Sequence, residues 1–219
     1  MEKAENVTEN GGENTQEKRY FAKVLWGGLL KSRKSAALPG AKIYPPTLTN
    51  SDLANIKIAK EMGVTGVMQP FVRDHSDLER VKEALREAGA EDIRLFAKIE
   101  NMDGVRKLEK LLPAADEIVI ARGDLGNAVH LWDLPGVQRQ ISEKCRAAGK
   151  PFMVVTQMLA SMERSPVPTR AEVNDIFHAV MDGAASIMVT GETAVGDYPV
   201  EVIRYMVNTV RSAEKEENR

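Results

Sequence analysis

The chain has 219 residues, of which 43% are apolar and 28% charged, enough to bury one sizeable hydrophobic core. Its 30 Lys and Arg residues are interspersed with 32 Asp and Glu residues, so nothing indicates binding to nucleic acid or to anionic lipid. No apolar stretch approaches the ~20 residues of a membrane span, and the polar first residues do not resemble a secretory signal peptide. We therefore expect a cytoplasmic protein without nucleic-acid or membrane partners.

Residues 1–37 are predicted to form a polar tail and connector. Residues 1–20 lack hydrophobic periodicity, which favours disorder. The basic run from Lys31 to Lys34 is interpreted as a solvated loop rather than a phosphate site. The single cysteine, Cys145, cannot form an internal disulfide and is interpreted as a packed structural thiol.

From residue 47 onward, capping signals and breakers alternate regularly with apolar runs. Helices are predicted from Thr49 to Gly63, from a Ser76–Glu79 capping box to Gly89, from Asp103 to Pro113, from Pro135 to Gly149, from a Thr169–Glu172 capping box to Gly183, and from Pro199 onward. Strands are predicted at Val64–Phe71, Ile93–Ile99, Glu117–Ala121, Phe152–Thr156 and Ser186–Thr190. Strands alternating with helices in this way indicate βαβ units and a parallel sheet.

The predicted strands are nearly continuous apolar runs, which indicates a sheet covered on both faces. Each run ends in polar residues, and polar groups at the carboxyl ends of successive parallel strands are typical of the active face of a (β/α)8 barrel. A full barrel of eight strands needs ~250 residues, whereas about five strands are recognisable here. The predicted fold class is therefore α/β, a partial (β/α)8 TIM barrel over residues 38–219.

The most informative residues are Lys98 and Glu100 at the end of one strand and Asp124 just after the next. Side chains at i and i+2 on a strand share a face, so Lys98 and Glu100 project together. A cation and a carboxylate at one strand end, with a second carboxylate at the neighbouring end, can bind a divalent metal and an anionic substrate. A purely structural Lys98–Glu100 ion pair is the alternative interpretation.

Nine stretches also occur in the order and approximate spacing of a known family. They are Leu38–Gly40, Leu48–Thr49, Phe71–Arg73, Lys98–Asn101, Ala121–Gly126, Ala148–Pro151, Thr156–Leu159, Pro168–Glu172, and Gly191–Ala194 with Gly196–Pro199. On these motifs the chain, from about Leu38 to Val210, resembles the later part of the catalytic barrel of pyruvate kinase. The resemblance implies a TIM barrel of the phosphoenolpyruvate/pyruvate type.

The resemblance implies phosphoryl transfer from phosphoenolpyruvate to ADP, giving pyruvate and ATP in glycolysis, with Mg²⁺ (or Mn²⁺) and K⁺ as cofactors. By motif, Lys98 resembles the essential lysine that stabilises the phosphoryl group and the enolate. Glu100 and Asp124 match the two carboxylates that hold Mg²⁺. Gly123 and Asp124 match positions whose backbone amides receive the substrate carboxylate, and Thr156 matches a threonine that binds substrate near the proton-delivery path.

Four further residues are predicted to support the site from behind those that touch the substrate: Arg73, Arg122, Gln157 and Glu192. Of these, Arg122 is interpreted as a salt-bridge residue between strands or subunits rather than as a substrate ligand. Arg170, inside its capping box, is interpreted as structural.

The family's opening strands, lid domain and C-terminal domain are not recognised in the sequence, nor are an arginine for the substrate phosphate and the K⁺ ligands. A parallel sheet uncovered at its first edge exposes backbone donors and apolar inner surface. We therefore expect the chain to form a homo-oligomer or to pair with another chain, and to be impaired as an enzyme when alone.

Two other functions remain open. A metal-dependent lyase or aldolase acting on pyruvate enolates also uses a Glu/Asp metal pair, although Lys98 and the 156–158 and 191–193 motifs favour the kinase. A non-catalytic fragment that pairs with a full-length kinase through its bare sheet edge is the third hypothesis.

Overall fold

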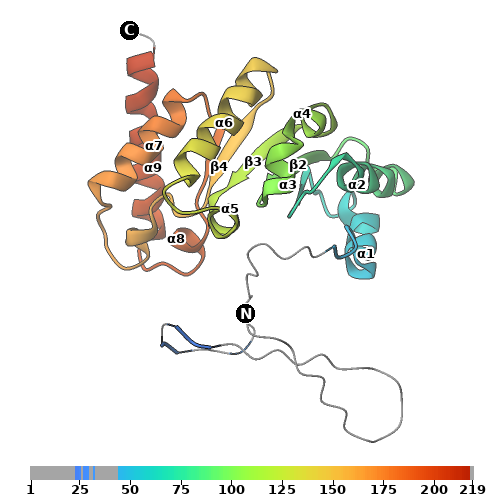
Figure 1. Cartoon of the computed structure of the whole chain (residues 1–219), viewed down its shortest axis with the longest axis horizontal. Helices are drawn as coiled ribbons and strands as arrows, with labels where there is room; N and C mark the ends of the chain where they lie inside the picture. Colours follow the sequence, from blue (N-terminus) through green and yellow to red (C-terminus); the bar gives the residue numbers. More distant parts are fainter. Residues whose placement is uncertain (1–22, 26, 30–31, 33–43, 218–219) are drawn as a thin grey trace, which may run out of the picture. The chain divides into compact units, whose positions relative to one another are not determined.

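A computed structural model of the chain describes residues 23–25, 27–29, 32 and 44–217 (Figure 1). The chain divides into two units, Met1–Ala36 and Ala37–Arg219. The predicted disordered stretch 1–20 lies outside the described residues, and so does the basic run 31–34 apart from Ser32. The described residues of the first unit belong to no helix or strand.

The second unit is built on a parallel sheet whose strands pair in chain order, β1-β2-β3-β4-β5. The strands are β1 (Gly66–Gln69), β2 (Arg94–Ile99), β3 (Glu117–Ala121), β4 (Phe152–Val155) and β5 (Ser186–Met188). Parallel order with a helical crossover after each strand is the arrangement of a TIM barrel. The structure thus confirms the predicted α/β class with five parallel strands and is consistent with a partial barrel.

The helices follow one another in chain order from α1 and α2 at one end of the unit to α7 and α9 at the other (Figure 1). They are α1 (Asn50–Ala59), α2 (His75–Glu87), α3 (Met102–Arg106), α4 (Leu108–Leu111), α5 (Arg122–Ala128), α6 (Leu134–Ala147), α7 (Arg170–Met181), α8 (Gly191–Ala194) and α9 (Pro199–Glu217), with short 3-10 helices η1 (Leu112–Ala114) and η2 (Ala160–Glu163). None of the described helices is long and apolar enough to cross a membrane.

Capping chemistry starts the helices, with one departure from prediction. Thr49 and Thr169 cap α1 and α7 in full capping boxes, as their sequences predict. The predicted box at Ser76 is wrong, because α2 begins at His75 with Asp74 as its N-cap. The Asp74 carboxylate accepts hydrogen bonds from both the backbone N–H and the hydroxyl of Ser76. Ser76 is therefore a donor to the N-cap residue and not the N-cap itself.

Other boundaries also differ from prediction. The helix predicted from Asp103 to Pro113 is interrupted at Lys107, whose backbone (φ −99°, ψ 9°) leaves the helical region, and its last turn tightens into η1 around Pro113. β1, β4 and β5 end earlier than predicted. After β1 and β4 the chain turns into the left-handed region, at Phe71 and Thr156, which ends the extended conformation.

The sheet has an apolar cluster on each face. Alternate residues such as Ile118 and Ile120 of β3 join the main core, which includes Leu78 of α2 and Ile141 of α6. The opposite, inner face carries a smaller cluster of strand residues alone: Val119, Ala121 and Val155, flanked by Phe96, Met153 and Met188. The three central residues are at most 1% exposed. The predicted exposure of the inner face therefore holds only at its rim, for example at Met68 of β1.

Cys145 on α6 is fully buried in the main core. Burial raises the pKa of its thiol to about 12, because the apolar surroundings disfavour the thiolate. The prediction of a packed structural thiol is confirmed.

An ion pair joins the chain after β1 to α2. Asp77, in the first turn of α2, is 3% exposed. Its carboxylate accepts hydrogen bonds from the Arg73 guanidinium at 2.7 and 3.0 Å, from the Arg73 backbone N–H and from the Thr47 hydroxyl. Burial opposes ionisation of this carboxyl, but these hydrogen bonds outweigh it and hold its pKa at about 2.

Asp77→Asn is expected to lower the free energy of unfolding at neutral pH by about 1.5–3 kcal/mol, the range for hydrogen bonds to a charged group. Because the folded-state pKa lies below the ordinary value of 3.8, ionised Asp77 stabilises the fold above that pH and loses its effect as the pH falls toward 2. Chemical denaturation at a series of pH values should show the difference between wild type and variant shrinking below about pH 4.

The matched control is Asp92→Asn, which removes an exposed carboxylate paired with Lys60 at 3.1 Å. Solvent screens this pair, so the control should change the free energy of unfolding much less. A difference between wild type and Asp77→Asn that stayed constant down to about pH 2 would contradict the assignment of the ion pair.

Candidate active site

Lys98 and Glu100 form a direct ion pair at the carboxyl edge of the sheet, the edge at which the strands end. Their side chains leave β2 on the same face, as the two-residue period predicts, and Lys98 Nζ lies 2.8 Å from Glu100 Oε1. The Glu100 side chain is 1% exposed, whereas that of Lys98 is 25% exposed. The ammonium therefore faces solvent in part and retains hydrogen-bond donors for a ligand.

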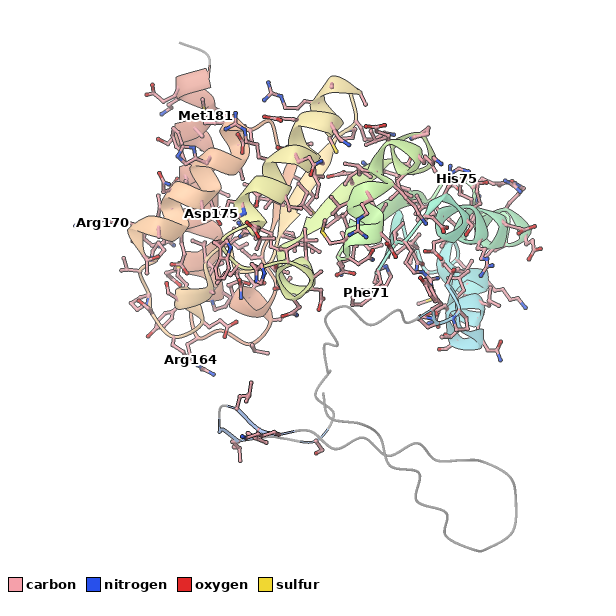
Figure 2. All side chains as sticks on the ribbon, in the orientation of Figure 1. Phe71, His75, Arg164, Arg170, Asp175 and Met181 are labelled. Carbon is pink, nitrogen blue, oxygen red and sulfur yellow. The ribbon has the colours of Figure 1, made fainter. Side chains whose placement is uncertain are left out.

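The second oxygen of Glu100 reaches across to the end of β1. The Phe71 backbone N–H donates to Glu100 Oε2 at 2.7 Å, and Phe71 has a φ of 50°, in the left-handed region. Phe71 lies at the same edge of the unit as Arg164, whereas Met181, the last residue of α7, lies at the opposite edge (Figure 2). Non-glycine residues in this region are uncommon and gather at functional sites.

The end of β3 is tied to the chain after β4 by Arg122. This guanidinium donates to the backbone carbonyl of Thr156 at 2.7 and 3.3 Å and to both carboxylate oxygens of Asp175 at 2.7 and 2.8 Å. Asp175 lies on α7, on the side that faces α5 (Figure 2). The interpretation of Arg122 as an ion-pair residue is thus supported, with the partner within the chain.

Gly123 and Thr156 meet directly. The Gly123 backbone N–H donates to the Thr156 hydroxyl oxygen at 2.8 Å, which joins the first turn of α5 to the residue after β4. A Cβ placed on Gly123 would lie 3.5 Å from that oxygen, an ordinary contact. This amide is one of the two that the family resemblance assigns to a substrate carboxylate.

Glu192 ties the ends of β4 and β5 together. It is 1% exposed, and its carboxylate accepts hydrogen bonds from the Thr190 backbone N–H at 2.8 Å and from the Leu159 backbone N–H at 3.3 Å. A buried carboxylate is tolerated only with such partners. Glu192 thus supports the carboxyl edge of the sheet from behind.

The two carboxylates predicted to bind metal follow neighbouring strands. Glu100 comes directly after β2, and Asp124 is an exposed residue in the first turn of α5, directly after β3. Mg²⁺ takes oxygen ligands, keeps several waters and needs only one or two carboxylates in addition to substrate oxygens. The donor types therefore fit Mg²⁺ or Mn²⁺, although no group of three or more metal-binding side chains occurs within the described residues.

The family model "Pyruvate kinase, barrel domain" matches residues 8–203 of this chain. The chain belongs to the pyruvate kinase family. The match extends N-terminal of Leu38, where the motif resemblance begins.

Curated relatives agree with this assignment. A pyruvate kinase of Bacillus licheniformis is 40% identical over 92% of the chain and 34% of the relative. One of Geobacillus stearothermophilus is 42% identical over 84% of the chain and 31% of the relative, and one of Candida albicans is 40% identical over 91% and 39%. The chain thus spans about a third of the length of these relatives.

The predicted residues other than Asp124, whose exposed carboxylate is described above, fall into three sets in the structure. Lys98 and Glu100 contact each other, and Gly123 contacts Thr156. Arg122, Gln157 and Glu192 belong to the loop after β4 or contact it: Arg122 donates to the Thr156 and Gln157 carbonyls, and Glu192 accepts from the Leu159 N–H. Arg73 is engaged by Asp77, the Pro45 carbonyl and the ring of Tyr44, so it holds the entry to α2. The proposed roles of all these residues in catalysis remain predictions.

Two residues of the site were not predicted. Phe71 stands in the Phe71–Arg73 motif, but its contribution is a backbone N–H, which no side-chain pattern reveals. Asp175 lies 53 residues from Arg122, on a helix with no polar motif of its own beyond the capping box. Only the packing of α7 in the fold brings Asp175 to Arg122.

Glu192→Gln is expected to destabilise the fold by about 1–3 kcal/mol, because one of the two backbone N–H groups would face an amide NH2 instead of an oxygen. Chemical denaturation at neutral pH measures the change. Glu201→Gln on α9 is the control, since its contact with Arg204 is exposed and 3.7 Å long, so less than about 1 kcal/mol is expected. Equal effects of the two substitutions would argue against a structural role of Glu192.

Proposed function

We propose that this chain carries the phosphoenolpyruvate-binding part of a pyruvate kinase and acts in transfer of a phosphoryl group from phosphoenolpyruvate to ADP. The observation that carries the proposal is the Lys98–Glu100 pair at the carboxyl edge, with Asp124 after the adjacent strand. The glycolytic role, the use of Mg²⁺ and K⁺, the cytoplasmic location and assembly with further chains are expectations from the same family membership.

In the proposed reaction the bond between phosphorus and the enol oxygen of phosphoenolpyruvate breaks, and a bond to a terminal oxygen of ADP forms. The enolate left behind takes up a proton at its methylene carbon and becomes pyruvate. Such transfers have loose transition states, so catalysis consists mostly of positioning and charge stabilisation. The ammonium of Lys98, held in place by Glu100 and exposed in part, is suited to the charge that develops on the phosphoryl and enol oxygens.

Glu100 and Asp124 would hold the divalent cation, which when bound polarises the oxygens of the substrate. Glu100 is also fixed by the Phe71 N–H, so its carboxylate does not have to reorganise when a ligand arrives. We assign the substrate carboxylate to the backbone amides of Gly123 and Asp124, and substrate binding near the path of proton delivery to the Thr156 hydroxyl. Because Gly123 N–H is bonded to that hydroxyl, a substrate carboxylate at this amide would share it with Thr156 or displace it.

Lys98→Met is expected to lower the rate of pyruvate formation from phosphoenolpyruvate and ADP by ~10²–10³-fold, as for loss of one preorganised charged donor. The same loss should appear in exchange of the pyruvate methyl protons with D2O, followed by NMR, a half-reaction that needs no nucleotide. This second measurement matters because the chain spans about a third of its relatives, so we expect weak turnover by the chain alone.

Lys144→Met is the matched control, because Lys144 on α6 pairs with Glu109 away from the carboxyl edge and should leave both rates unchanged. Rates unaffected by Lys98→Met would remove the proposal. Cleavage of a 2-keto-4-hydroxy acid without any pyruvate formation from phosphoenolpyruvate would instead assign the site to an aldolase. No turnover alone, combined with co-purification of an intact kinase, would support the non-catalytic fragment.

Divalent-metal binding provides a test that does not depend on turnover. Glu100→Gln and Asp124→Asn should each weaken Mn²⁺ binding in the presence of oxalate, a mimic of the enolate, by at least about tenfold, since even outer partners of metal ligands are worth 10–100-fold. Titration followed by the electron paramagnetic resonance of Mn²⁺ gives the affinities.

The control for metal binding is Asp103→Asn. Asp103 stands in the first turn of α3 after β2, as Asp124 stands in the first turn of α5 after β3, and it pairs with Arg106 at 3.5 Å. Its removal should leave the Mn²⁺ affinity unchanged. Affinities that are equal in wild type and in both site variants would exclude Glu100 and Asp124 as ligands.

A further inference from the structure

Two consecutive residues after β4, neither of them glycine, have the left-handed backbone conformation that favours glycine. The backbone φ is 76° at Thr156 and 54° at Gln157. For a β-branched residue such as threonine a positive φ is a genuine outlier, because Cβ approaches the neighbouring carbonyl group. Such a conformation persists only where the surrounding structure holds it.

The guanidinium group of Arg122 donates hydrogen bonds to the backbone carbonyls of both residues. Arg122 donates to the Thr156 carbonyl through Nε and Nη2, and Nη2 also lies 3.3 Å from the Gln157 carbonyl. Its remaining nitrogen, Nη1, donates to both oxygens of Asp175. The guanidinium is planar, so fixing one end against Asp175 also fixes the direction of the other. The Arg122 side chain is 10% exposed, so solvent screens these contacts little.

The hydrogen bonds from Arg122 to the Thr156 carbonyl restrain the backbone of Thr156, and the position of its hydroxyl depends on that backbone. That hydroxyl accepts from the backbone N–H of Gly123, the residue next to Arg122 in the first turn of α5. The same turn therefore holds Thr156 twice, by its carbonyl through a side chain and by its hydroxyl through a backbone amide. If the carbonyl were released, the strained backbone would relax and carry the hydroxyl away from Gly123.

We infer that Arg122 is a positioning residue of the active site, which holds Thr156 in its strained conformation and thereby presents the Thr156 hydroxyl at the first turn of α5. The inference rests on the proposed function, in which Thr156 and the Gly123 amide bind the substrate. If Arg122 only linked the end of β3 to α7, a positive charge opposite Asp175 would be enough. To position Thr156 as well, the residue needs the planar guanidinium, whose other nitrogens donate to the Thr156 carbonyl.

Arg122→Lys separates these two roles, because lysine keeps the charge opposite Asp175 and lacks the fork. The measurement is hydrogen exchange of backbone amides by NMR on the full chain labelled with ¹⁵N-glycine. The chain contains 16 glycines, so the spectrum is limited to their amides. The Gly123 resonance is assigned by its absence in Gly123→Ala. We expect exchange at Gly123 to become at least about tenfold faster, as local opening becomes easier.

Two helix-end glycines serve as internal controls in the same spectra. The amides of Gly89 and Gly149 donate to Arg86 and Arg146 carbonyls, remote from α5 in the chain. Their exchange reports local opening away from α5, so it should stay unchanged in Arg122→Lys. If exchange at Gly123 rises no more than at Gly89 and Gly149, Arg122 only links the end of β3 to α7 and the inference fails.

The matched substitution elsewhere is Arg164→Lys. Arg164 also donates to both oxygens of one aspartate, Asp197, at 3.0 Å each, but its side chain is 73% exposed. It should leave exchange at Gly123 unaltered. A second variant tests the strain: Gln157→Gly removes the penalty of the positive φ at residue 157, one of the two strained residues, so Arg122→Lys should affect Gly123 less in that background. An undiminished effect would contradict the strain argument.

Kinetics tests the link to function. Arg122→Lys should lower kcat for pyruvate formation, or the rate of methyl-proton exchange, by about 10²-fold, the cost of a small misplacement of a reacting group. KM for ADP should not change. Absence of any turnover in wild type would overturn the proposed function, while hydrogen exchange at Gly123 would still decide whether Arg122 positions Thr156.

Discussion

The carboxyl edge of the sheet depends on the buried carboxylate of Glu100. A carboxylate on a side chain that is 1% exposed is costly unless both oxygens have partners, and here they are the Lys98 ammonium and the Phe71 backbone N–H. The second partner requires the chain to turn sharply after β1, with Phe71 in the left-handed region. The buried charge of Glu100 thus contacts a lysine of β2, the strand it follows, and a backbone N–H in the chain after the neighbouring strand β1.

The same principle recurs along the edge. The loop after β4 is held from two sides, by Arg122 after β3 and by Glu192 after β5. In each case a side chain with little exposure bonds to the backbone of the neighbouring strand end. Backbone groups fixed in this way cannot reorganise freely when a charged ligand arrives, which is the condition for electrostatic catalysis. The inner apolar cluster, centred on Val119, Ala121 and Val155, packs residues of β3 against β4.

Features set by local periodicity could be predicted from the sequence. β3 was predicted with its observed bounds, because all five of its residues are buried and its apolar run is continuous. The shared face of Lys98 and Glu100 followed from the two-residue period of a strand and is confirmed by their 2.8 Å contact. Features set by contacts distant in sequence could not be predicted. β4 ends one residue before Thr156, which has a positive φ and whose carbonyl is hydrogen-bonded to Arg122, 34 residues away.

Arg73 and Arg122 show why residue type and local context are insufficient. Both arginines follow a strand of the sheet and both stand in motifs that resemble the family, so both are predicted to support the site. Arg73 forms an ion pair with Asp77, four residues later, and the pair therefore stabilises the start of α2. The acid that pairs with Arg122 is on α7, 53 residues away, which leaves the rest of the guanidinium over the Thr156 carbonyl. The position of the partner acid, which only the fold determines, thus directs one arginine to stability and the other to the edge where the substrate would bind.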